Sequence, residues 1–223
     1  MLETVEIAYV TPAPGANFAD AESDAGKALA LVNETSSKQP GCKANYYGQQ
    51  VEHPELLQLG IVWTSVDAHK AFTESPDYGA FLASVQPVVA GPDAIRLFHV
   101  ELATPFSTAA SAPVVEFLTC YFPPSYSNAQ FDAVWDSFAS ELMTTADGAK
   151  GTVGGWVVEE LEHKSLEAHG GKGKAFVAAI GWESVEKHMA YRDTDKFKEI
   201  IQPFRKEVSG IEMHHVELKL WQG

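Results

Sequence analysis

The chain repeats itself, and this repeat constrains the fold more than any other feature of the sequence. Short motifs of the first half return in the second half in the same order. The matched pairs are Val5–Ile7 with Val115–Phe117, Glu52–His53 with Glu162–His163, Trp63–His69 with Trp182–His188, Gln86–Pro87 with Gln202–Pro203, and His99–Leu102 with His215–Leu218. The spacing grows in the glycine-rich segment 164–174, which we interpret as an insertion. The sequence therefore predicts two copies of one structural unit.

The repeat also predicts the domain organisation. We expect a first repeat at residues 1–103 and a second at 114–223. The residues between them, 104–113, are rich in Thr, Pro, Ser and Ala, a composition typical of a linker.

Hydrophobic periodicity predicts the order strand, helix, strand, strand, helix, strand in each repeat. In the first repeat the expected strands are 5–10, 46–51, 57–63 and 96–102, with helices at 18–35 and 65–72. In the second repeat they are 114–121, 156–161, 176–182 and 212–220, with helices at 131–143 and after Ser184. This order is the ferredoxin-like α+β motif. Because its sheet has helices on one face only, we expect the two antiparallel sheets to pack into a single-chain α+β barrel, a monomer with pseudo-twofold symmetry.

Charge and hydropathy exclude several partners. The formal net charge is −14, with 30 acidic residues against 16 Lys and Arg, so we expect neither nucleic acid nor an anionic membrane as a partner. No apolar run approaches the roughly 20 residues of a membrane span, and the first residues lack the pattern of a signal peptide. We expect a cytoplasmic protein.

Several catalytic and cofactor motifs are absent from the sequence. The run Gly170–Gly173 has neither the spacing nor the following helix of a phosphate-binding loop. No Gly-x-Ser-x-Gly nucleophile motif occurs, and the histidine spacings do not form a helical metal pair. We therefore expect no cofactor and no metal.

Two motifs resemble a known superfamily. The pattern Trp63-x-Ser65-x-x-x-His69, followed by Ser75–Tyr78 and Phe81-Leu82, resembles the antibiotic-biosynthesis monooxygenase branch of the dimeric α+β barrels. The segment Trp182–Glu186 resembles the stress-responsive barrel branch, which includes a plant polyketide cyclase. The resemblance covers nearly the whole chain, twice. It implies the fold, and it allows cofactor-free oxygenases, polyketide cyclases, haem enzymes and proteins without known activity.

Two helical histidines are candidate general bases. His69 and His188 each lie four residues after a serine that caps the predicted helix. An imidazole has an ordinary pKa of about 6.5, which suits proton transfer near neutrality. His188 and Tyr191 are i, i+3 neighbours, so we expect both to point into one pocket. The alternative is that both histidines are structural.

Histidines on the last strand of each repeat form a second group of candidates. Alternation places His99 and His215 on one face of their strands and His214 on the other. The last strand of this fold lies beside the first, so Glu6 and Glu116 can approach these imidazoles and orient them. The alternative is a satisfied core histidine beside an exposed carboxylate.

Aromatic residues at matched positions are candidate substrate contacts. We expect a substrate-binding surface made of four of these aromatic residues together with His99 and Glu116. The four aromatic residues are Trp182, Trp156, Phe197 and Tyr78. The family resemblance implies a functional role for Tyr191, although Phe197 stands where that family places a histidine. Most of these aromatics can instead be core residues. A cavity lined by them suits a small, flat, phenolic ligand.

The residues support three functions. The first is a cofactor-free cyclase or isomerase in which His188, or failing it His214 or His215, moves a proton of a polyketide-derived phenol, as in closure of a chalcone to a flavanone. Tyr191 would polarise or position a substrate oxygen, and His69 is the alternative base if the first repeat is the active one. The second is a cofactor-independent monooxygenase that oxidises a dihydroxyarene with dioxygen. The third is a non-catalytic binding or stress-related protein. We rank cyclisation first and place it in the second repeat, because Tyr191 and His214 replace Phe72 and Phe98 there.

Overall fold

The computed structural model describes residues 2–223 and divides the chain into two compact units. The first unit contains the residues up to His99 together with Leu218–Gly223. The second contains Val100–Glu217. Each unit has its own hydrophobic core, and each is described by itself.

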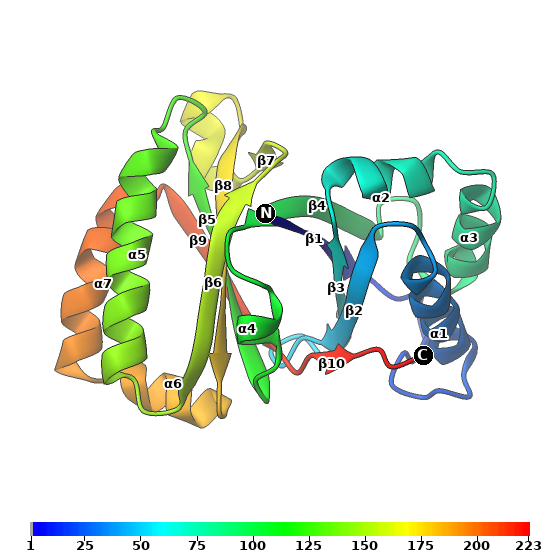
Figure 1. Ribbon diagram of the computed structural model, residues 1–223, viewed down its shortest axis with the longest axis horizontal. Helices are drawn as coiled ribbons and strands as arrows, with labels where there is room; N and C mark the ends of the chain where they lie inside the picture. The colour runs from blue at the N-terminus through cyan, green and yellow to red at the C-terminus, as the bar shows by residue number, and fades with distance from the viewer. Residues whose placement is uncertain (1) are drawn as a thin grey trace. The chain divides into compact units, whose positions relative to one another are not determined.

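The first unit is a four-stranded ferredoxin-like sheet with helices on one face (Figure 1). Its elements follow the predicted order, with the second helix in two parts: β1 (Glu3–Val10), α1 (Asp24–Ser37), β2 (Cys42–Gln49), β3 (Leu57–Trp63), α2 (Val66–Thr73), α3 (Tyr78–Val85) and β4 (Ile95–Leu102). A short 3₁₀ turn, Gln86–Val88, follows α3. The strand order is β2-β3-β1-β4, and a two-residue strand, β10 (Lys219–Leu220), pairs with β2. The core lies between the sheet and helices α1 and α3.

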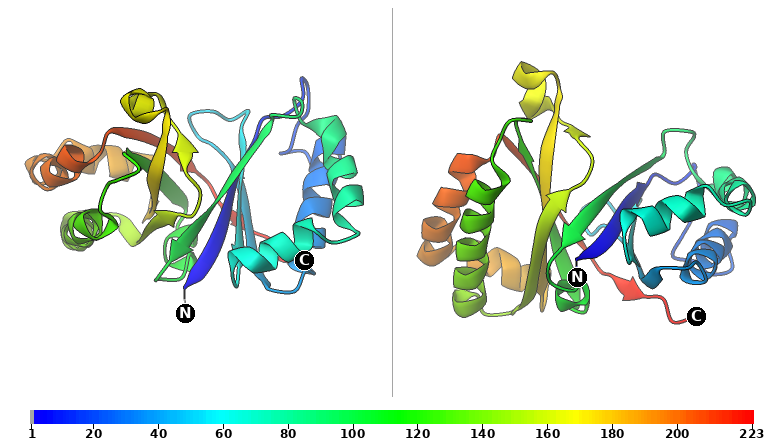
Figure 2. Two further views of the ribbon diagram at one scale, coloured as in Figure 1. Left: turned by 90° about the horizontal axis from the view of Figure 1, so that it is seen from above. Right: turned by 45° about the horizontal axis from the view of Figure 1, so that its top comes forward.

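The second unit repeats this architecture with longer helices, and α5 and α7 lie side by side on one face of its sheet (Figure 2). Its elements are α4 (Ser107–Ala110), β5 (Val114–Phe122), α5 (Asn128–Thr145), β6 (Ala149–Val157), β7 (Leu161–Glu162), β8 (Lys172–Trp182), α6 (Val185–Arg192), α7 (Asp195–Glu207) and β9 (Gly210–Val216). The strand order is β6-β8-β5-β9, with β7 paired to β8. The last residues of β4, Val100–Leu102, pair with β6 in this unit. The α+β class and the ferredoxin-like order of both repeats are therefore confirmed, while the mutual packing of the two sheets stays a prediction.

Serine caps fix the starts of two helices in the first unit. The Ser23 side chain accepts a hydrogen bond from the Gly26 amide, so α1 begins at Asp24 rather than at residue 18 as predicted. Phe18 lies before the helix but is still buried in the core. The Ser65 side chain accepts from the Ala68 amide and starts α2 where the sequence predicts it.

The prediction for strand β6 is wrong. The sequence predicts residues 156–161, whereas β6 is Ala149–Val157. Glycines hide it from a hydrophobicity pattern, because each permits a close approach that a side chain would block. A Cβ atom on Gly151 would lie 2.1 Å from the carbonyl oxygen of Thr108, and one on Gly154 would lie 2.7 Å from the Phe176 ring.

Two further predicted segments differ from the structure. The predicted strand 212–220 is two strands, β9 and β10, in different units. The predicted insertion 164–174 contains a 3₁₀ helix, Lys164–His169, and the start of β8. Strand β7 pairs with the start of β8, and Gly170, at φ +86°, ends the 3₁₀ helix with its amide directed at backbone carbonyl groups. Backbone hydrogen bonds therefore order this segment.

Residues 104–113 carry α4, whose residues Ala109 and Ala110 are buried, as is Phe106 just before it. The segment belongs to the second unit and packs against β6 and β8.

In the described part of the chain, no helix is both long and apolar enough to cross a bilayer.

Candidate functional site

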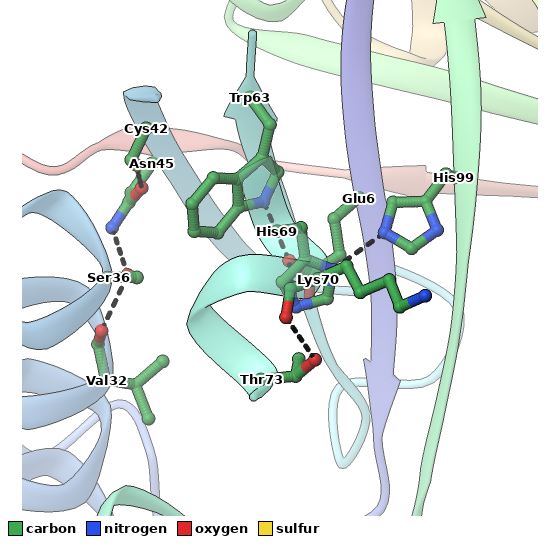
Figure 3. Close-up of polar contacts among 10 residues, drawn as sticks. All are labelled: Glu6, Val32, Ser36, Cys42, Asn45, Trp63, His69, Lys70, Thr73 and His99. Atoms are coloured by element: carbon green, nitrogen blue, oxygen red, sulfur yellow. Dashed lines mark hydrogen bonds and ion pairs between the residues drawn. The ribbon is translucent and has the colours of Figure 1, made fainter. Parts of the chain in front are cut away.

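Four side chains from four elements meet inside the first unit (Figure 3): Glu6 from β1, Trp63 from β3, His69 from α2 and His99 from β4. The Trp63 indole donates its Nε1 hydrogen to Glu6 Oε2 over 2.9 Å. His69 Nε2 lies 3.4 Å from the same oxygen, and His69 Nδ1 lies 2.7 Å from His99 Nε2. These residues form one connected group, which we call the Glu6 network.

The local sequence explains how the His69 ring is held. His69 lies four residues after the Ser65 cap, one turn into α2 and close to the end of β3. Its ring stacks on the Trp63 indole, with centroids 5.1 Å apart and an interplanar angle of 25°. Glu6, Trp63, His69 and His99 are all buried. The network is therefore desolvated and fixed from several sides.

The hydrogen bond between the two imidazoles restricts where protons can lie. One ring must donate and the other must accept. If His99 donates to Nδ1, a neutral His69 carries its proton on Nε2 and presents it to the Glu6 carboxylate. If His69 donates, its Nε2 lone pair accepts a proton from a protonated Glu6. The two states differ by one proton moved along each bond, so the network can relay a proton between Glu6 and His99.

The Glu6 carboxyl titrates near neutral pH. Burial raises its pKa from 4.5 to about 7, although the hydrogen bond from Trp63 and the positive charge of His99 act in the opposite direction. A carboxyl group with such a pKa exists in both protonation states at neutral pH, which is the property that a general acid or base requires.

The Glu6 network borders a cavity of about 290 Å³ between the sheet and the helices of the first unit. Its walls are mainly aliphatic and aromatic, and no lysine or arginine lines it within the described residues. The polar groups that line it are Glu6, Trp63, His69, Tyr78 and Ser36. Burial, followed by the charge of Glu6, raises the pKa of the Tyr78 hydroxyl, so this group stays protonated and can donate a hydrogen bond. The geometry suits a mostly apolar ligand with its acidic hydrogen at one end.

The second unit contains the same network with nearly the same distances. The Trp182 indole donates to Glu116 Oε2 over 2.9 Å, and His188 Nε2 lies 3.3 Å from that oxygen. His188 Nδ1 lies 2.7 Å from His215 Nε2. The adjoining cavity is much smaller, about 110 Å³, and is lined by Glu116, Trp182, His188 and Phe197 among others.

Several residues expected at the site of the second repeat lie elsewhere. Tyr191 does not line the cavity with His188, and its hydroxyl lies 2.6 Å from Thr145 Oγ1. The Trp156 indole donates to Asp132 Oδ1. His214 lies on the opposite face of β9 from His215 and stacks on the Phe117 ring.

The residues of the first repeat fit the cavity better. Tyr78 and His69 line its wall, and His99 contacts His69 from behind. The sequence analysis includes Glu6 and Glu116 as partners of the strand histidines, but among the tryptophans of this network it expects only Trp182, and not Trp63, at the site. The repeat offset is the signal that identifies Trp63. Among the described residues, no group of three or more His, Cys, Asp or Glu side chains is arranged to hold a metal ion.

Comparison with known proteins gives one family and several structural relatives. Residues 5–84 match the sequence model of a family described as antibiotic biosynthesis monooxygenase. Comparison with curated proteins gives no match.

Solved structures resemble the chain over nearly its whole length. An anthrone oxidase-like protein has a TM-score of 0.66 and 15% identity, and the match covers 98% of this chain and 93% of that one. A candidate monooxygenase from Lactobacillus acidophilus NCFM has a TM-score of 0.62 and 13% identity over 99% and 96% of the two chains. One from Fusobacterium nucleatum subsp. nucleatum ATCC 25586 has a TM-score of 0.63 and 10% identity over 98% and 94%. At these identities the likeness shows the fold alone.

Proposed function

We propose, from the match of residues 5–84 to the model of the antibiotic biosynthesis monooxygenase family, that the chain is an oxygenase acting on an uncharged, hydroxylated polycyclic aromatic compound. The substrate lies in the cavity of the first unit. The observation that carries the proposal is a carboxyl group with a pKa of about 7, Glu6, at the wall of an otherwise apolar cavity.

The cavity supports this substrate class through its size and charge. A cavity of about 150 Å³ holds one benzene molecule, so a volume of about 290 Å³ accommodates two or three fused rings. Among the described residues, no lysine or arginine lines the cavity to balance a substrate carboxylate. Tyr78 and Phe81 stack at one side, 5.6 Å between centroids, and offer flat contacts to an aromatic ring.

Glu6 is the proposed general base. Its contacts to Trp63 and His69 both use Oε2, which leaves Oε1 as the oxygen that a bound substrate can reach. Both ring nitrogens of His69 face protein partners, Glu6 and His99. His69 is therefore a positioning residue that accepts the proton from Glu6 and passes it toward His99.

The chemistry balances without a further reductant. In the case of anthrone, the base removes a proton from the ring methylene, and the resulting anion transfers its electrons to dioxygen to give a hydroperoxide. Loss of water from this hydroperoxide yields anthraquinone. The methylene carbon supplies all four electrons, one oxygen atom becomes the carbonyl oxygen and the other leaves as water. The Glu6 network returns the first proton to the peroxide anion, which gives the hydroperoxide. As hydroxide leaves, the carboxylate takes the second methylene proton and passes it to the hydroxide to form water.

Cyclisation, which the sequence analysis ranks first, needs the same base and the same cavity. The family match favours oxygenation over it. The two reactions differ in one measurable respect, because only oxygenation consumes dioxygen.

The test uses the purified full chain with anthrone and 1,8-dihydroxyanthrone, with no added cofactor and after dialysis against a chelator. We expect one dioxygen consumed for each quinone formed, and one labelled oxygen in the product when the reaction runs under ¹⁸O₂. Catalysed conversion of a phenolic enone without dioxygen uptake would instead indicate a cyclase. Binding of these compounds without any turnover would contradict the proposal.

A further inference from the structure

We infer that the second unit contains a plugged copy of the site, in which the network is complete but Phe138 occupies the space that a ligand fills in the first unit. Each chain then has one open binding site and one latent site. The ligand class, an uncharged aromatic hydroxyl compound, rests on the proposed function. The inference itself concerns binding and does not require turnover.

The two cavities are equivalent places in the two repeats. Many residues that line the first cavity have a partner, at an offset of 110, 119 or 116 residues, among those that line the second. These pairs are Glu6 with Glu116, Ala8 with Leu118, Ala28 with Phe138, Val32 with Leu142, Ile61 with Ile180, Trp63 with Trp182, His69 with His188, Val85 with Ile201, Ile95 with Ile211, and Leu97 with Met213. The two volumes can therefore be compared, because each cavity borders the same network of side chains.

Helix α5 carries the largest difference. Ala28 and, one turn later, Val32 of α1 line the first cavity, whereas Phe138 and, one turn later, Leu142 of α5 line the second. The Phe138 ring is buried and packs against Phe204, with centroids 5.2 Å apart. Phe204 itself stands where the first repeat has Val88. The wall of the second cavity thus contains a ring pair, Phe138 and Phe204, where α1 of the first unit presents the small side chain of Ala28.

The first strand adds to the filling. Ala8 of β1 corresponds to Leu118 of β5, which also lines the cavity. One position has the smaller side chain in the second unit, because Leu59 of β3 corresponds to Ala178 of β8. The second cavity is nevertheless the smaller of the two. The remaining volume, about 110 Å³, is smaller than the roughly 150 Å³ that holds a benzene molecule. A two-ring compound therefore cannot enter without displacing Phe138.

The network of the second unit survives although no ligand of this size can reach it. Glu116, Trp182, His188 and His215 keep their contacts within 0.1 Å of the corresponding distances around Glu6. The second unit therefore keeps the side chains of the site but lacks the space for a ligand. Removal of the Phe138 ring should make this space available and restore binding.

The experiment measures how many molecules of 1-naphthol bind to the full chain by titration calorimetry. We expect one per chain for the wild type, two for Phe138→Ala and none for Ala28→Phe. Ala83→Phe, the same exchange at an exposed position of α3, is the control and should keep one. Circular dichroism verifies that each variant is folded.

Each other result overturns the inference. Two molecules bound to the wild type would show that the second cavity is open. A folded Phe138→Ala variant that binds only one would show that Phe138 is not the plug. If Phe138→Ala does not fold, Ala28→Phe decides, because its binding of one molecule with unchanged affinity would place the ligand outside the first cavity. Absence of anthrone oxidation would refute the proposed function and leave these stoichiometries unaffected.

Discussion

His69 and His99 share one hydrogen bond in the interior of the first unit, with Nδ1 of His69 2.7 Å from Nε2 of His99 and the rings tilted by 50°. Because one ring must accept along this bond, the pair holds at most one positive charge. That charge lies close to Glu6 and lowers the pKa of its carboxyl group against the larger effect of burial.

Replacement of His99 should move the titration of Glu6. In His99→Asn the positive charge is lost, so the pKa of Glu6 should rise above about 7. The midpoint of the pH–kcat/KM profile should shift to higher pH, while the rate at high pH changes less than the rate at pH 7. A uniform loss of rate at every pH would indicate that His99 has only a structural role.

Activity should increase with pH through the pKa of Glu6. The base acts as the carboxylate, so the active fraction grows as the pH rises through about 7. The measurement is kcat/KM for anthrone from pH 5 to pH 9, corrected for the uncatalysed oxidation. A rate that falls through this interval would require a protonated Glu6 and would exclude it as the base.

The stability of the protein should carry the opposite pH dependence. The folded pKa of Glu6 is raised, so between pH 4.5 and about 7 the native state keeps a proton that the unfolded chain has released. The free energy of unfolding therefore decreases as the pH rises through this interval, by roughly 3 kcal/mol in total. Glu6→Gln keeps an acceptor for Trp63 and should be more stable than the wild type at pH 8 but not at pH 4. Urea unfolding at the two pH values checks this, and equal differences at both would contradict it.

The duplication predicts a monomer. If the two repeats supply to each other what smaller proteins obtain by dimerising, light scattering after size exclusion should give one chain of 24.2 kDa. A stable dimer of about twice this mass would show that the repeats do not complete a barrel within one chain.

Much of the fold follows from the sequence because the repeat shows the same pattern twice. Strand β3 is Leu57–Trp63 as predicted, and Ser65 starts α2, since a run of apolar residues and a capping side chain are local signals. The bounds of strand β6 do not follow from the sequence, because its glycines are required by close contacts with the backbone and with aromatic rings that are distant in sequence. A hydrophobicity pattern does not contain such contacts.

The site could be predicted only in part. The histidines, Glu116 and Trp182 stand out through type and repetition, and their catalytic roles stay predictions. The preference for the second repeat rests on Tyr191 and His214, but the Tyr191 hydroxyl contacts Thr145 and the His214 ring stacks on Phe117, so neither lines the cavity. Ala28 and Phe138 are both apolar helical positions, so periodicity alone cannot tell an open cavity from a filled one.

The activity of two matched variants tests the central claim, that Glu6 at the open cavity carries the chemistry while its counterpart in the second unit does not. Glu6→Gln and Glu116→Gln make the same change in the same network. We expect Glu6→Gln to lower kcat for anthrone oxidation by about 10²–10⁴ and Glu116→Gln to change it less than about threefold. Equal loss in both variants, or loss in Glu116→Gln alone, would contradict the account.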